Sequence, residues 1–84
     1  MEKKPFSQII NRGIVTKEGK RLGVVKDITF ETRTGELLQL VVSEPTAYAN
    51  HLGLDKNKQK EMTIPYSTVI AIGDFVVVSE EDIA

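Results

Sequence analysis

The sequence contains no cysteine, which excludes disulfide bonds and thiolate metal sites. Its 84 residues suffice for one domain, and such a domain buries only about 60–65% of the surface that its unfolded chain exposes. A core of this size seldom supplies more than about 3–5 kcal/mol, and small domains commonly add disulfides, metals or oligomerisation. Because disulfides are excluded, we expect self-association, with a homodimer as its simplest form.

An excess of charge of one sign is also lacking. Eleven basic residues against twelve acidic ones give a net charge of −1, which argues against an obligate nucleic-acid binder. The charges are nearly balanced in number but unevenly distributed along the chain. Basic residues outnumber acidic ones up to Glu31, and the tail at 79–82 carries only acidic charges. Any nucleic-acid contact is therefore expected near the start of the chain.

Long hydrophobic runs are absent as well. No apolar run approaches the roughly 20 residues that a membrane-spanning helix needs. No hydrophobic signal core follows Lys3 and Lys4. We therefore expect a protein without a membrane span that resides in the cytoplasm.

The strongest positive signal is that of β-strands. Residues 21–31 are rich in β-branched side chains, but Val25, Ile28 and Phe30 do not keep one period of two. This break in the alternation predicts a β-bulge near Lys26 and Asp27, of the kind that lets a small barrel bend. Phe30 is expected among the core residues.

A hairpin turn is predicted at 32–35, where Gly35 can take a positive φ. The returning strand, 36–42, is largely apolar, with Gln39 as a break in the apolar run. Its predicted core-facing residues are Leu38, Leu40 and Val42, and its predicted outward-facing residues are Leu37 and Val41.

Four further strands are expected, at 13–16, 62–64, 69–72 and 75–78. Pro65 removes a ladder donor and belongs at a strand end or edge, and Gly73 and Asp74 form a tight turn. Phe75 is expected in the core. Several short strands with turn signals between them predict an all-β sandwich or small barrel.

Residues 45–60 form a connection that is unusually long for a compact domain. Thr46 to Gly53 could form one or two helical turns, and a capped helical turn is predicted at 7–10. Residues 80–84 are expected to be a solvated acidic tail. The whole chain, 1–84, is interpreted as a single domain with its core at about 7–79.

Three segments resemble the PRC-barrel family in the order of their residues: GKRLGVVKDITF at 19–30, TGEL at 34–37 and IPYSTVIAIGDFVVV at 64–78. The resemblance implies a small six-stranded barrel-like fold without catalytic residues, here with one long connection between the middle strands. Relatives include the cytoplasmic domain of the photosynthetic reaction centre H subunit, the carboxy-terminal domain of a ribosome maturation factor, and short archaeal proteins, some of them associated with cell division. Their shared property is docking onto another macromolecule.

No set of residues has the spacing of a catalytic or metal site. His51 is the only histidine, and no serine or threonine is placed to serve as its nucleophile. Asp27 and Asp74 stand at bulge and turn positions, where a carboxylate usually accepts backbone N–H groups. The three acids at 80–82 are adjacent on a chain end and are expected to stay solvated. We therefore expect no enzyme activity, no metal and no cofactor.

Two surfaces are candidates for binding. The predicted protein interface consists of Leu37, Val41, Tyr48, His51, Leu52 and Leu54. An equally supported alternative is that the long connection folds back over the barrel's own edge. The predicted nucleic-acid contact consists of Lys17, Lys20, Arg21 and Lys26.

These surfaces lead to two functional hypotheses. The first is a non-catalytic protein-interaction or adaptor module that self-associates and docks on a larger assembly. The alternative is an RNA- or ribosome-associated domain that binds through its basic first hairpin. Exposed aromatic rings would favour the alternative, because single-stranded nucleic acids stack on them.

Overall fold

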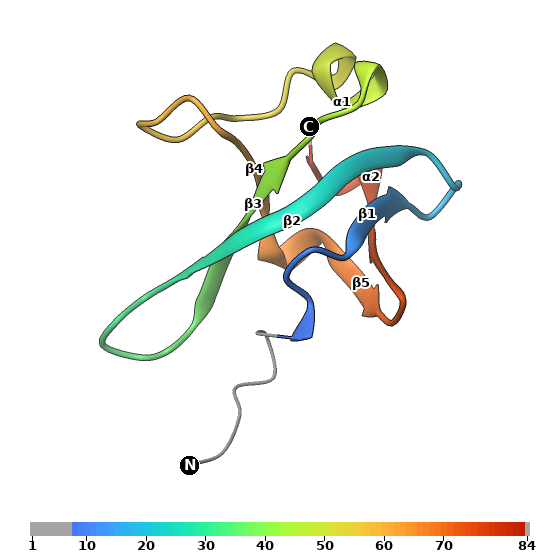
Figure 1. Ribbon diagram of the computed structural model, residues 1–84. Helices are drawn as coiled ribbons and strands as arrows, with labels where there is room; N and C mark the ends of the chain where they lie inside the picture. The colour runs from blue at the N-terminus through green and yellow to red at the C-terminus, as the bar shows by residue number, and fades with distance from the viewer. Residues whose placement is uncertain (1–7, 84) are drawn as a thin grey trace.

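The computed structural model describes residues 8–83, which form one six-stranded sheet with short helices (Figure 1). The strands are β1 (Gly13–Thr16), β2 (Arg21–Phe30), β3 (Leu37–Ser43), β4 (Met62–Pro65), β5 (Val69–Ile72) and β6 (Phe75–Val78). The helices are α1 (Ala47–Leu52), the 3₁₀-helix η2 (Tyr66–Thr68) and α2 (Glu80–Ile83). The predicted all-β class with six strands is confirmed.

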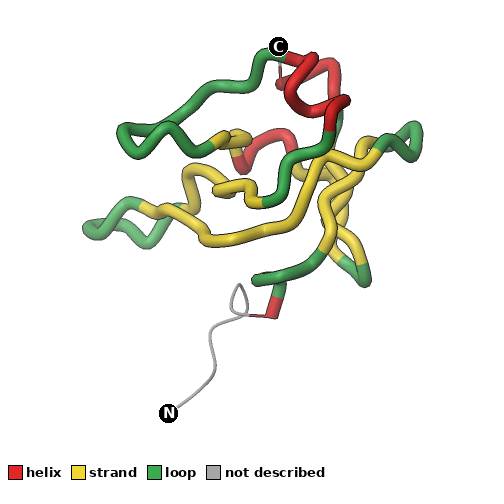
Figure 2. The backbone as a smooth tube through the Cα atoms, turned by 45° about the horizontal axis from the view of Figure 1, so that its top comes forward, coloured by secondary structure: helices red, strands yellow, loops and turns green. Residues whose placement is uncertain are grey.

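The strands follow the spatial order β4-β3-β2-β1-β6-β5. Neighbours are antiparallel except β1 and β6, which pair in parallel, so the sheet is mixed. β4 and β5 are the two ends of the ladder, and η2 joins them along the chain. The long β2–β3 hairpin extends beyond the rest of the sheet (Figure 1), whereas α1 and α2 meet at one end (Figure 2).

The core is aliphatic, and every strand except β5 supplies buried residues to it. β5 contributes only Val69, which is half-buried against the core. The core's fully buried members come mainly from the middles of the strands: Ile14, Leu22, Val25, Leu40, Ile64, Val76 and Val78. The predicted bulge is confirmed, because the β2–β3 register shifts between Val25 and Asp27. The extra residue lets Val25 and Ile28 both face the interior, as the broken alternation required.

The predicted facing of β3 is wrong at Leu37 and Leu38, and the predicted exposure of Val41 is wrong as well. A second register shift pairs Phe30 with Leu37 and leaves Leu38 unpaired, so Leu37 packs against the core and Leu38 is 45% exposed. Val41 faces away from the main core cluster but is only 4% exposed. It lies between Asp27 of β2 and Thr63 of β4, a middle-strand position that leaves it little contact with solvent.

The two phenylalanines expected in the core are also placed differently, at 44% exposure for Phe30 and 43% for Phe75. Phe30 lies beyond the second register shift, next to the turn that closes the hairpin. Phe75 pairs with Gly13 and alternates with the buried Val76, so its ring lies on the outer face of the sheet.

The long connection contains the predicted helix. The Thr46 hydroxyl caps α1 by accepting the Ala49 N–H at 3.1 Å, and Gly53 ends the helix in the left-handed conformation. The same hydroxyl donates to the Arg21 carbonyl at 2.7 Å, which ties α1 to β2. Ala49 and Leu54 are buried in the core, so this part of the connection covers the domain itself.

The two chain ends differ in how well they follow the prediction. The turn expected at 7–10 is present in its described part, where residues 8–11 form a turn and Ile9 is buried in the core, while Ser7 lies outside the described residues. The acidic tail is not a wholly solvated segment, because its residues 80–83 form α2. Glu80 is half-buried there, and Ile83 packs against the core.

Candidate interaction surface

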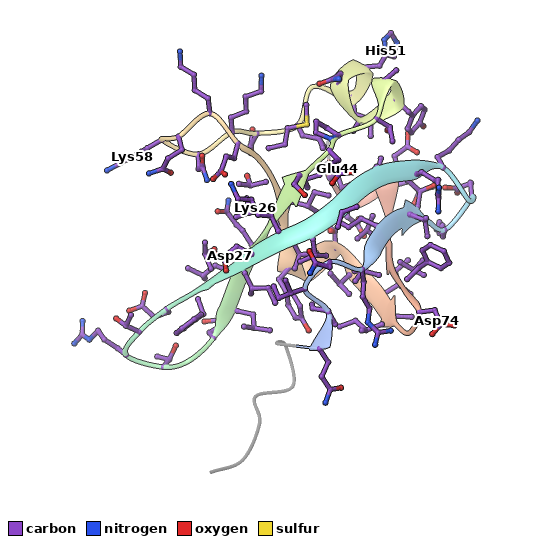
Figure 3. All side chains as sticks on the ribbon, in the orientation of Figure 1. Lys26, Asp27, Glu44, His51, Lys58 and Asp74 are labelled. Carbon is purple, nitrogen blue, oxygen red and sulfur yellow. The ribbon has the colours of Figure 1, made fainter. Side chains whose placement is uncertain are left out.

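The residues expected to form a protein interface around α1 do not form a continuous exposed face. Tyr48 and Leu52 are half-buried against the core, and Leu54 is 7% exposed. His51 alone of these α1-region residues is exposed, and it points away from the sheet (Figure 3). The amphipathic character of this segment therefore serves largely to attach it to the barrel.

Tyr48 joins three elements of the fold. Its hydroxyl donates to the Glu80 carboxylate at 2.7 Å, which links α1 to α2. The Lys20 ammonium lies 5.6 Å from the centre of its ring. The hydrogen bond to Glu80, together with desolvation, raises the pKa of Tyr48 above its usual value. These contacts give Tyr48 a structural role.

The predicted nucleic-acid residues are largely engaged within the domain. Lys17 lies 3.9 Å from Glu81, and Lys20 lies over Tyr48. Lys26 forms a hydrogen-bonded ion pair with Glu61. That pair raises the pKa of Lys26 and lowers the pKa of Glu61.

Arg21 differs from the three lysines, because its guanidinium lies 5.8 Å from the centre of the exposed Phe75 ring. This is the one predicted nucleic-acid residue that the structure brings beside an exposed aromatic face.

The candidate catalytic residues do not converge. His51, Asp27 and Asp74 lie on separate elements and do not point toward one another (Figure 3). As predicted, the Asp27 carboxylate accepts a backbone N–H, that of Ile28, at 2.8 Å. Asp74 instead lies 3.9 Å from Arg12 with its carboxylate in solvent. Within residues 8–83, no group of three or more histidine, aspartate and glutamate side chains is placed to hold a metal ion.

The surface that sequence reasoning missed lies on β5 and β6. Ile70 is 55% exposed, Ile72 45% and Phe75 43%, and we call these three residues the β5–β6 patch. The strands themselves were predicted, and an uncharged run at 66–73 was a visible signal. Their exposure could not be read from the sequence, because it depends on β5 lying at the end of the sheet.

Local structure accounts for each member of the patch. The β5–β6 register shifts between Val69 and Ala71, which leaves Ile70 unpaired. Phe75 lies over Gly13, where an added Cβ would come within 3.0 Å of the ring. Glycine therefore makes room for the ring against the outer face of β1.

Ile72 also borders a groove of about 560 Å³. The groove has an apolar lining supplied by Ile9, Leu37, Tyr66 and Ile72, and Arg12 stands at its rim. A second hollow, of about 410 Å³, lies between α1 and α2 and is lined by Tyr48 and its neighbours. Of the two, only the first is continuous with the β5–β6 patch, through Ile72.

Six strands around one aliphatic core define a small β-barrel domain whose candidate sites all lie at its surface. The model of the family described as PRC-barrel domain matches residues 1–82, and the chain belongs to that family. It is 37% identical over 83 residues to "Uncharacterized protein MJ1118" of Methanocaldococcus jannaschii. That alignment covers 99% of this chain and 89% of the archaeal protein. None of the helices in the described part of the chain is long and apolar enough to cross a membrane.

Proposed function

We propose that this chain is a non-catalytic protein-interaction module that self-associates and docks on a larger assembly. The observation that carries the proposal is the β5–β6 patch. Three of the five large apolar side chains exposed in the described residues lie between Ile70 and Phe75. Grouped exposed apolar side chains on a small domain mark interaction sites, and aromatic residues are common anchors of such sites.

Three further features support the proposal. Arg21 lies over Phe75, and arginine and aromatic residues are enriched in protein interfaces. The family adds support, because PRC-barrel domains are typically non-catalytic. The groove beside Ile72 extends the apolar surface that a partner would cover.

Affinity capture with matched variants tests the proposal. Phe75→Ser removes a 43% exposed ring from the patch, and Leu38→Ser removes a 45% exposed side chain from the β2–β3 hairpin. We expect wild type and Leu38→Ser to retain the same partner protein and Phe75→Ser to lose it, with all three equally folded by circular dichroism. Identical recovery with the wild type and both variants, or no partner together with a monomer in sedimentation, would contradict the proposal.

RNA or ribosome binding is the second candidate. The exposed Phe75 ring with Arg21 beside it is the observation that favours it, since such pairs stack on unpaired bases. Fluorescence anisotropy with single-stranded RNA tests it at about 50 and 200 mM salt. RNA binding predicts affinity that falls with salt and is weakened by combining Lys17→Glu with Lys20→Glu. Absent or salt-independent binding would exclude it.

A further inference from the structure

The two ends of the sheet differ in how their backbone is covered. The outer edge of β4 is occupied by the chain that precedes it: Lys56 bridges to Met62, and the Thr63 N–H donates to the Asp55 carbonyl at 2.8 Å. β4 also ends in Pro65, which cannot donate to another strand. This end of the sheet is therefore closed to a further strand.

The end formed by β5 lacks these protections. β6 is its only ladder neighbour among the strands described. Ile70, Ala71 and Ile72 are all exposed, and β5 contains neither proline nor a charged residue. Exposed edges in natural proteins usually carry such residues to prevent pairing, and β5 has only its length of four residues and the bulge at Ile70 as protective features.

Charge favours a second copy of the same chain as the occupant. No charged residue occurs in the run 66–73, so two copies of β5 can lie together without like-charge repulsion. Asp74, which directly follows the run, lies 3.9 Å from Arg12, so these two charges offset one another. Antiparallel pairing centred on Ala71 would place Ile70 of each copy opposite Ile72 of the other.

We propose that β5 is the self-association edge, and that it pairs antiparallel with β5 of a second copy to form one sheet across a two-fold axis. This inference rests on the proposed function and names the surface through which self-association occurs. Within residues 8–83 each chain offers one open edge, because residues 55–57 cover β4. Association therefore stops at a closed dimer and does not continue into a fibre.

Sedimentation of matched variants over a wide concentration range tests the edge. Ile70→Lys places a charge on the edge, and Leu38→Lys makes the same change at a similarly exposed apolar side chain outside it (55% and 45% exposed). We expect wild type and Leu38→Lys to dimerise, and Ile70→Lys to raise the dimer dissociation constant at least about tenfold, since two isoleucines are lost per dimer. A dimer that is insensitive to Ile70→Lys, or disrupted by Leu38→Lys, would overturn the inference.

Amide hydrogen exchange distinguishes strand pairing from a simple apolar contact. The backbone amides of 69–72 that point away from β6 should exchange more slowly as protein concentration rises. The exchange rates of the amides of 62–65 should not change. Absence of this protection in a dimer would overturn the inference.

The inference and the proposed function can fail separately. A chain that is monomeric throughout, but still captures a partner through Phe75, would refute the β5 dimer and leave the docking function standing. A dimer lost in Ile70→Lys, with no partner captured, would support the inference and refute docking.

Discussion

Gly23 is the position at which a single methyl group should have the largest effect on stability. Its φ is +152°, and an added Cβ would lie 2.6 Å from Val42 Cγ1 and 2.8 Å from the Ser43 carbonyl oxygen. Both atoms belong to β3, which pairs with β2 immediately beyond Gly23. Gly23→Ala therefore forces apart the two central strands of the sheet.

Two costs add at this position. Holding a residue with a side chain at such a φ costs about 1–3 kcal/mol, and overpacking in a closely packed region costs about 1–3 kcal/mol more. A core of this size supplies about 3–5 kcal/mol, so the sum consumes most of the stability. For a domain of 60–100 residues each kcal/mol shifts the midpoint by about 4–8 °C, so a fall of about 10 °C or more is expected.

Thermal and urea unfolding followed by circular dichroism measure the effect against two control glycines. Gly35 has φ +78° and no atom within 4 Å of an added Cβ, so Gly35→Ala should cost about 1–2 kcal/mol from conformation alone. Gly73 has open space and no positive φ, and Gly73→Ala should change stability by less than about 0.5 kcal/mol. If Gly23→Ala costs no more than Gly35→Ala, the close approach of β2 and β3 is refuted.

Three further predictions concern the core and two side-chain contacts. Leu40→Asp should unfold the domain because it buries an unpaired carboxylate, whereas Lys58→Asp, on an exposed loop, should change the unfolding free energy by less than about 0.5 kcal/mol. One of the two tyrosines, Tyr48, should ionise at higher pH than usual by ultraviolet titration, and Glu80→Gln should lower its pKa again. Glu61→Gln should reduce the loss of stability in acid, measured by urea unfolding near neutral pH and below pH 4.

The ion pair of Lys26 and Glu61 links stability to pH in one direction. Hydrogen bonds from Lys26 and Asn57 lower the pKa of Glu61, so the folded state favours its ionised form. The resulting stabilisation is present above the carboxyl group's usual pKa and is lost as pH falls through the lowered value. Equal acid sensitivity of wild type and Glu61→Gln would contradict this link.

For the core prediction, equal stability of Leu40→Asp and Lys58→Asp would contradict the register of β3.

Local chemistry made much of the fold predictable. The broken alternation of Val25 and Ile28 indicated the bulge, and Thr46 and Gly53 marked the two ends of α1. Each of these features depends on residues within a few positions of one another. The exposure of Leu38 was mispredicted because the second bulge of the hairpin does not visibly break the spacing of apolar residues in the sequence.

The sequence by itself determined where the strands, turns and first bulge lie and which aliphatic residues can form a core, since these follow from short-range periodicity and turn chemistry. Only the tertiary structure decided that β1 and β6 pair in parallel, that residues 55–57 cover β4, and that β5 is left at an open edge. Those pairings join segments far apart in the chain, and a strand's own residues do not specify which neighbour covers each of its edges. For that reason Ile70, Ile72 and Phe75, the residues on which the proposed function depends, emerged as a surface only once the sheet was assembled.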